Sequence, residues 1–466
     1  MKLSKLLSKT TKDVPSGEVS KNAILLEQAG YIDKLTAGVY SYLPLGYDVI
    51  RNIARIVQEE MNKAGAQEIY MPAIHPKANW AKTGRWETVD VLFKTKSRWG
   101  SQEYCLGPTH EEIVVPLVKR FVQSYKDLPT AVYQIQNKFR DEARPKSGLL
   151  RGREFIMKDL YSFHKTEEDR ADYYEKMIEV YKKIFRRCGF KNVLVTTAGG
   201  GSFTDKHSHE FQVLTDAGED TVYVCDDCGY AENAEVAEAR GKTFDGQIWC
   251  NNDACSAKFA MASPAMTKKK AIEIGNIFDL GVKFSEDFDL YYMDEDGQKK
   301  PVIIGCYGIG ISRVMGALVE HLADDRGLVW PQEVAPYDIY LTYFKSKKEE
   351  YKDLLPKLAE SLYKRLQSIT CGTTGHDMGT LRVLFDDRDI RNGRKLAEAD
   401  ALGIPYRIII SEKTLNAEIT YGKGKYGVKY GAEVKARTAD TPTMVGFSEY
   451  TSDYLQGFIL GWEAEG

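Results

Sequence analysis

Hydrophobic residues recur at helical spacing in three stretches of the first half of the chain. In the clearest of them the apolar positions are Val49, Ile50, Ile53, Ile56, Val57 and Met61. This spacing predicts an amphipathic helix, and Gly65 is placed to end it. Residues 167–188 repeat the pattern with a buried face of Tyr, Met, Ile and Phe, and residues 18–36 are also predicted to be helical.

The second half of the chain alternates between strand-like and helical patterns. Beyond a proline-marked linker at 329–337, strands are predicted at 339–344, 381–385 and 406–410, with helices near 354–366 and 391–402 between them. Strands joined by helices form right-handed crossovers, which favour a largely parallel sheet covered by helices. Residues 411–446 are too irregular for an assignment.

A predicted hairpin in the first half carries an unusual density of charge. Its strands end near residue 142 and run through 154–157, on either side of a polar loop with Pro145 and two glycines. Cations and anions alternate along it: Arg140, Arg144, Arg151 and Arg153 with Asp141, Glu142 and Glu154. Such a surface suits a nucleoside triphosphate, because it can grip a polyanion and also accept hydrogen bonds from a neutral ring. Taken alone, a solvated surface hairpin would be the more common explanation.

Composition narrows the class of protein. A chain of 466 residues predicts two or three domains, and 43% hydrophobic and 28% charged residues are ordinary for a soluble protein. The sequence has no apolar run of the roughly 20 residues that a membrane span needs and no signal-peptide core near residue 1, so we expect a cytoplasmic protein. The net charge of −3 predicts that any RNA contact depends on local basic patches.

Four of the eight cysteines have the spacing of a metal site. Cys225 and Cys228 are followed after 21 residues by Cys250 and Cys255. Two such knuckles present four thiolates tetrahedrally, as structural Zn²⁺ requires, and they point to a reducing compartment. The four-residue gap inside the second knuckle leaves a metal-free pair of turns as the alternative.

Three motifs in order resemble those of the class II aminoacyl-tRNA synthetases. The first motif is resembled by the predicted helix and strand that end at Pro72. The second is resembled by Phe-Arg-x-Glu at 139–142 together with Arg-Gly-Arg-Glu-Phe at 151–155. The third is resembled by Gly-x-Gly-x-x-Arg at 308–313. Residues 151–164, the sequence GPTHEE at 107–112 and GCYGIG at 305–310 are similar to prolyl-tRNA synthetases of bacterial type.

Two other functions are compatible with part of this pattern. Synthetases for threonine, serine or glycine share the three general motifs, but GPTHEE and GCYGIG favour proline. A non-enzymatic paralogue that binds RNA or a partner protein tends to lose the motif arginines, whereas Arg140, Arg151 and Arg313 are all present.

The resemblance implies a fold and partners. We expect an α+β catalytic domain, an antiparallel sheet flanked by helices, from residues 1–221 and 271–332. A small cysteine-rich insertion would occupy 222–270, and an α/β anticodon-binding domain with a mostly parallel sheet would occupy 337–466. L-proline, ATP and tRNA(Pro) would be the substrates, and the first motif would build a homodimer.

The resemblance also implies residue roles. Arg140 and Arg313 would be catalytic. The residues that would bind proline are Thr109, Glu111, Arg140, His209, Cys306 and Gly308. The residues that would bind ATP with Mg²⁺ are Arg140, Glu142, Arg151, Phe155, Gln212, Gly310 and Arg313. Candidates for contact with tRNA are Arg388, Arg391, Arg394 and Lys395. Asn276 stands where the family usually carries His, so no role tied to that imidazole transfers.

One family feature is expected to be missing. Many bacterial members carry, between the second and third motifs, an insertion of well over a hundred residues that hydrolyses alanine mistakenly attached to tRNA. The corresponding interval here, 222–270, holds roughly 50 residues, too few for a domain with its own core and hydrolytic site.

Overall fold

The structure is a computed structural model that describes residues 1–15, 17–201, 204, 206–241, 246–258, 264–368, 370–371, 379–420 and 429–448. These residues form two compact units. One contains Met1–Asp33, Ser41–Asn52 and the chain from Leu322 onward, and the other contains Lys34–Tyr40 and Ile53–His321. The helices of the described part include none that is both long and apolar enough to cross a membrane.

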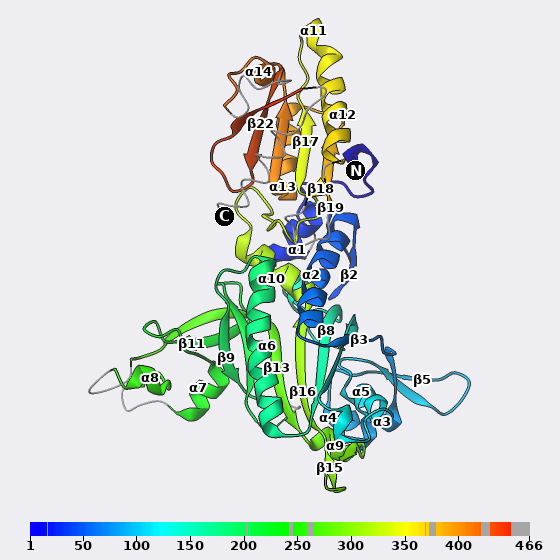
Figure 1. The fold of residues 1–466 in the computed structure, drawn as a ribbon. Coiled ribbons are helices and arrows are strands. Elements are labelled where there is room, and N and C mark those ends of the chain that lie inside the picture. Colours follow the sequence, from blue (N-terminus) through cyan, green and yellow to red (C-terminus); the bar gives the residue numbers. More distant parts are fainter. Residues whose placement is uncertain are drawn as a thin grey trace. The chain divides into compact units, whose positions relative to one another are not determined.

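The larger unit is built on a nine-stranded sheet in the order β10-β9-β12-β11-β13-β16-β8-β7-β3 (Figure 1). Its strands are β3 (Gln67–Glu68), β7 (Thr130–Phe139), β8 (Glu154–His164), β9 (Leu194–Ala198), β10 (Ser208–Leu214), β11 (Asp220–Val224), β12 (Ala231–Asn233), β13 (Thr267–Gly281) and β16 (Ile303–Gly310). Neighbours are antiparallel except for β3 with β7 and β9 with β12. The predicted antiparallel sheet, including the β7–β8 hairpin, is confirmed.

One strand of this sheet is shared between two groups of strands. The first part of β13 pairs with β11 and its second part with β10, while its other edge pairs with β16. Strands β13, β10, β9, β12 and β11 therefore close on themselves. Val222, Val224, Ala231 and Ala271 form the apolar cluster of these strands.

Helices cover the sheet of the larger unit. The longest is α6 (Glu167–Cys188), which begins at the Thr166 cap, ends at Gly189 with φ +107° and packs against β8 and β16 (Figure 1). Its bounds are those that the apolar spacing predicts. The other helices that include residues of this unit are α2 (Pro44–Lys63), α3 (Lys77–Lys82), α4 (Arg85–Thr88), α5 (Glu111–Val118), α7 (Ala234–Arg240), α8 (Asp253–Ser256), α9 (Lys283–Asp287) and α10 (Ile311–Leu322). Two small sheets complete it: β4 (Ile74–Pro76), β5 (Phe93–Lys96) and β6 (Glu103–Leu106), and β14 (Tyr291–Met293) with β15 (Lys299–Pro301).

The predicted helix at 18–36 is only partly correct. Helix α1 spans Lys21–Gln28, and Gly30 then adopts a positive φ of 71°. This left-handed residue ends the helix and turns the chain into a strand pair, β1 (Ile32–Thr36) with β2 (Val39–Tyr42).

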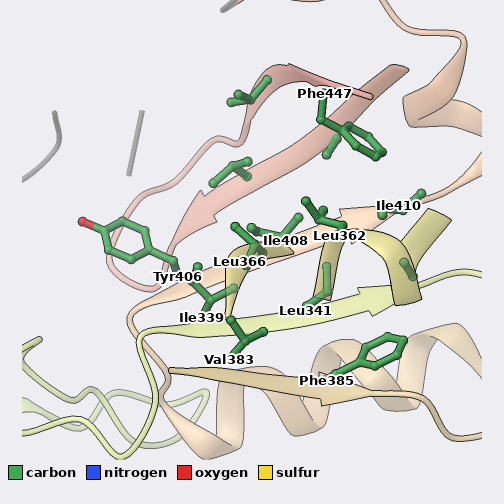
Figure 2. Packing of buried hydrophobic residues seen from close by; sticks show 14 of the residues in the cluster. Ile339, Leu341, Leu362, Leu366, Val383, Phe385, Tyr406, Ile408, Ile410 and Phe447 are labelled. Carbon is green, nitrogen blue, oxygen red and sulfur yellow. The ribbon is translucent and has the colours of Figure 1, made fainter. Parts of the chain in front are cut away.

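The C-terminal part of the smaller unit contains a five-stranded sheet in the order β20-β17-β21-β22-β23. Strands β17 (Ile339–Tyr343), β20 (Val383–Asp386) and β21 (Tyr406–Ile410) are parallel, as predicted. Strands β22 (Tyr430–Ala436) and β23 (Thr443–Phe447) come from the irregular stretch and extend the sheet antiparallel. Figure 2 shows the apolar side chains of the sheet, among them Leu341, Ile408 and Phe447, packed with Leu362 and Leu366 of α12.

The remaining elements of the smaller unit are α11 (Glu349–Lys352), α12 (Leu354–Leu366), α13 (Asn392–Leu402), α14 (Glu412–Leu415), β18 (Thr370–Cys371) and β19 (Gly379–Thr380). The first residues of the chain also belong here, because Lys2 forms a β-bridge with Phe385 and the Met1 amino group donates to the carbonyl of Val383. These first residues had been predicted to belong to the catalytic domain, residues 1–221.

Candidate active site

A cavity of about 250 Å³ opens beside the β7–β8 hairpin. Its lining comes from the hairpin, from β13 and from the start of α10, and includes Arg140, Glu142, Arg151, Glu273 and Arg313. A small recess adjoining it reaches Gly152 and Phe155. The structure thus brings together the five predicted ATP-site residues that lie on the hairpin and α10.

Arg140 lies where β7 ends, with its guanidinium carbon 5.1 Å from the centre of the Phe155 ring. Within the part of the chain that the structure describes, its guanidinium makes no hydrogen bond or ion pair. Burial and the positive charge of Arg313 lower the pKa of Arg140. Its donors are therefore free for an anionic ligand that would also relieve the repulsion.

The other two arginines are held by protein groups. Arg313 donates from Nε to the carbonyl of Leu150 at 2.9 Å and from Nη1 to Glu273 Oε2 at 3.1 Å. Arg151 donates to Glu142 Oε2 at 3.0 Å, and about half of its side chain is exposed. Gly310 belongs to this arrangement because a β-carbon there would lie 3.1 Å from Arg313 Cβ.

A buried carboxylate marks a second part of the site. Glu111 opens α5, is fully buried, and accepts from the Thr109 hydroxyl at 2.6 Å and from the Cys306 thiol at 3.3 Å. Arg85 Nη1 lies 3.4 Å from Glu111 Oε2, the oxygen that also accepts from Thr109, and 2.9 Å from Glu112 Oε1. Burial, together with the negative charge of Glu111, raises the pKa of Cys306 well above its usual value, so the thiol stays protonated and donates.

Open space lies next to this carboxylate group. A β-carbon on Gly308, two residues after Cys306 on β16, would meet nothing closer than the Asn276 carbonyl at 3.8 Å. A small ligand can therefore rest against the strand at this point. Thr109, Glu111 and Cys306 therefore lie together, and Gly308 follows Cys306 on β16.

His209 does not lie where the sequence analysis expected it. Residues that face each other across antiparallel strands point to the same side of a sheet, and His209 is in register with Ile277, which is in register with Tyr307. That is the α6 side, where His209 Nδ1 lies 2.9 Å from the Tyr174 hydroxyl. Cys306 belongs to the opposite side, so this side chain is directed away from the predicted proline pocket, and the expectation for His209 is corrected.

Gln212 lies in a cluster of carboxylates. Its Nε2 donates to Glu210 at 2.9 Å and to Asp220 at 3.3 Å, while its buried Oε1 has no partner within the described residues. Burial and the charge of Glu273 raise the pKa of Glu210 to about 7. Glu210, Glu273 and Arg85 are not among the residues that the sequence predicts for the site. A signal was present in Glu273, an acid between the apolar residues Ile272 and Ile274 of β13.

The four cysteine sulfurs lie within 4.8 Å of one another. Cys225 and Cys255 are 3.9 Å apart and Cys228 and Cys250 are 3.7 Å apart. Gly229, with φ +74°, closes the first knuckle. In the second knuckle the Asn252 side chain caps helix α8 by accepting from Cys255 N, which accounts for the unusual four-residue gap.

The four cations predicted to contact tRNA divide into two pairs. Lys395 is buried and donates to the carbonyls of Tyr343 and Asp386, so it cannot reach an RNA, and this corrects the prediction. Arg388 is held by Asp386 and Glu398. Arg391 and Arg394 instead line a groove of about 1440 Å³, together with Lys12, Lys345 and Lys347.

Two family models match separate parts of the chain. Residues 93–322 match the family "tRNA synthetase class II core domain (G, H, P, S and T)" and residues 338–431 match "Anticodon binding domain". The chain is 34% identical to the proline–tRNA ligase of Syntrophomonas wolfei, over 89% of this chain and 94% of that one. That alignment extends over 551 positions, so the relative carries well over a hundred residues that this 466-residue chain lacks.

Solved structures show the same fold. The prolyl-tRNA synthetase of Giardia lamblia, in complex with prolyl-adenylate, is 21% identical with a TM-score of 0.68, over 91% of this chain and 72% of that one. The enzyme of Cryptosporidium parvum, complexed with halofuginone and AMPPNP, is 16% identical with a TM-score of 0.70, over 95% and 78%.

Proposed function

The chain belongs to the proline–tRNA ligase family of class II aminoacyl-tRNA synthetases, and we propose that it activates L-proline with ATP at the cavity beside Arg140 and transfers the prolyl group to tRNA(Pro). The observation that carries the proposal is the partly buried Arg140 guanidinium, which has free donors and lies over the Phe155 ring, in the same unit as the buried Glu111 carboxylate.

In the first step a proline carboxylate oxygen attacks the α-phosphate of ATP, and pyrophosphate leaves. Because the nucleophile is already an anion, the protein contributes mainly position and charge neutralisation. Arg140 can donate to both reacting anions, and Phe155 below it offers a face for the adenine. Arg313 and Arg151 would hold the distal phosphates, and Glu142 would accept from the adenine amino group.

In the second step a hydroxyl of the terminal adenosine of tRNA attacks the carbonyl carbon of prolyl-adenylate, and AMP leaves. Proline is recognised by its secondary ammonium, whose two N–H groups suit the Glu111 carboxylate and the Thr109 oxygen. Cys306 and Gly308 line the space for the ring. Primary ammonium ions are held less well by a pair of acceptors arranged for two donors.

Mg²⁺ would be held by Glu273 and Gln212. The orphaned Oε1 of Gln212 and the carboxylates of Glu210 and Glu273 are oxygen ligands of the kind that this cation prefers. When bound, the ion neutralises charge on the triphosphate.

We propose that the four-cysteine cluster binds structural Zn²⁺. At a Zn–S distance of about 2.3 Å, sulfurs at the corners of a tetrahedron are about 3.8 Å apart, close to the 3.7 and 3.9 Å found here. All four positions would be filled by protein, so the metal stabilises residues 222–270 and takes no part in the chemistry. Metal analysis that finds no zinc, with four freely titratable thiols, would refute this.

The groove lined by Arg391 and Arg394 suits the anticodon arm of tRNA. Lys12, Lys347 and Arg391 carry no ion pair among the described residues, so their charge is available to phosphates. A homodimer through the first-motif region is supported by the exposed apolar residues Tyr70 and Ile74 beside the edge strand β3.

As a translation enzyme the protein would work in the cytoplasm.

Exchange of labelled pyrophosphate into ATP tests the proposed function. It should depend on proline and respond weakly to threonine, serine, glycine and alanine. Exchange that follows another amino acid would indicate a sister synthetase, and no exchange with any amino acid would indicate a binding protein.

A further inference from the structure

Beneath the Thr109–Glu111 loop lies a buried polar network that the mechanism above does not use. Lys138 on β7 and Asp159 and Tyr161 on β8 are its centre, and none of the three side chains is more than 2% exposed. Lys138 Nζ lies 2.7 Å from Asp159 Oδ1. Tyr161 donates its hydroxyl hydrogen to Asp159 Oδ2 at 3.0 Å.

This network holds His110, the residue between Thr109 and Glu111, at two points. The backbone N–H of His110 donates to the Tyr161 oxygen at 3.0 Å. The ring Nδ1 lies 2.9 Å from Lys138 Nζ. An ammonium group can only donate, so Nδ1 is the acceptor and the ring proton is on Nε2. Nε2 then donates to the carbonyl of Pro72 at 3.1 Å.

A second histidine fixes the same carbonyl. Trp80 Nε1, which can only donate, lies 3.3 Å from His75 Nδ1, so His75 also carries its proton on Nε2. That Nε2 lies 3.1 Å from the Pro72 carbonyl, which thus accepts from both imidazoles through its two lone pairs. Burial lowers the pKa of His75 to about 3 and that of His110 to about 2, so both rings are neutral.

The loop has no room to adopt another path. A β-carbon on Gly107 would lie 2.5 Å from the His75 ring and 3.1 Å from the His110 ring. The backbone at 107 therefore passes directly over the two imidazoles. His110 is fixed at its ring and at its backbone, and Thr109 and Glu111 on either side of it are fixed as a consequence.

A contribution to the free energy of folding does not by itself explain why this ion pair and its hydrogen bonds are buried here. Buried ion pairs are costly to desolvate, and apolar residues of similar volume often give equal or greater stability. What a buried network of ion pairs and hydrogen bonds adds is a single geometry. We propose that Lys138, Asp159 and Tyr161 act as positioning residues that hold His110, and through it orient the Thr109 hydroxyl and the Glu111 carboxylate toward the secondary ammonium of proline.

This inference rests on the proposed function and is tested by Tyr161→Phe, which removes one oxygen from the network and preserves the ring. The His110 N–H then loses its acceptor and the loop gains freedom. The KM for proline in pyrophosphate exchange should rise on the order of 10-fold, while the KM for ATP stays within about twofold. A general structural defect would lower the fraction of active sites, and therefore kcat, without separating the two KM values.

Tyr292→Phe is the matched control, because this tyrosine belongs to the same apolar cluster and its hydroxyl donates to the Lys165 carbonyl at 3.1 Å. It should leave both KM values near those of the wild type. Lys138→Met is a second variant, expected to raise the proline KM selectively as well. The inference is overturned if Tyr161→Phe leaves the proline KM unchanged, raises both KM values equally, or is matched by Tyr292→Phe. Loss of proline-dependent exchange in the wild type would instead overturn the proposed function.

Discussion

Replacing Arg140 by alanine should separate catalysis from folding. In the structure the guanidinium contacts one aromatic ring, that of Phe155, and donates no hydrogen bond to the described protein groups. Its removal should therefore cost stability only the cation–π contact, about 0.5–2 kcal/mol. Relief of the repulsion with Arg313, which lowers the pKa of Arg140, offsets part of that loss.

The effect on catalysis should be much larger. A preorganised charged donor that contacts the reacting phosphate contributes about 10²–10³-fold to the rate, or about 2.7–4 kcal/mol. Pyrophosphate exchange at saturating proline and ATP should therefore fall by at least this factor in Arg140→Ala, while the thermal unfolding midpoint shifts by only a few degrees. Arg144→Ala, in the same hairpin but exposed and outside the cavity lining, should retain wild-type exchange. An Arg140→Ala enzyme that activates proline at near wild-type rate would refute the assignment.

Three further outcomes are expected. Glu111→Gln keeps the size of the side chain but removes the charge that faces the substrate ammonium, so the KM for proline should rise about 10–100-fold with little change in that for ATP; equal changes would show a structural role. Burial raises the pKa of Glu112 from 4.5 to about 7, so the folded protein keeps a proton that the unfolded chain has lost. The free energy of unfolding should therefore decrease as pH rises from about 4.5 to 7, and Glu112→Gln should flatten this decrease in unfolding midpoints measured across that range. Finally, alanine fits the pocket with a penalty of only about 1–3 kcal/mol per missing methylene, so the enzyme should make some alanyl-tRNA and fail to hydrolyse it when preformed alanyl-tRNA(Pro) is supplied; hydrolysis that disappears on deletion of residues 222–270 would contradict this.

The sequence correctly predicted the helices and strands that depend on interactions between residues close in the chain. Helix α6 has the bounds that its apolar spacing and its flanking Thr166 and Gly189 imply. The hairpin and the parallel strands β17, β20 and β21 were also correct. Strands β22 and β23 were missed because they are stabilised by pairing with β21 rather than by any regular pattern of their own.

In the candidate site, too, the sequence predicts what residues close in the chain determine and misses what distant contacts determine. Motif residues at the hairpin converge because a hairpin brings sequence neighbours together. His209 was misplaced because its side depends on the register of β10 with β13, and one residue of shift reverses the side of every side chain. Lys395 was misjudged because its ammonium group donates to the carbonyls of Tyr343 and Asp386 on two neighbouring strands, which a helical charge pattern does not reveal.

The two ends of the cysteine-rich segment have a consequence for how long the connection between them can be. The segment connects Val224 of β11 to Thr267 of β13, which are direct partners across the two strands, and on the way it adds the three-residue strand β12 to the sheet. Any chain inserted here begins and ends at two residues that face each other across paired strands. Closing a flexible loop between such points costs only about 0.6 kcal/mol more for each doubling of its length. A longer chain between Val224 and Thr267 would therefore cost the sheet little free energy, because its two ends are already held side by side by the pairing of β11 with β13.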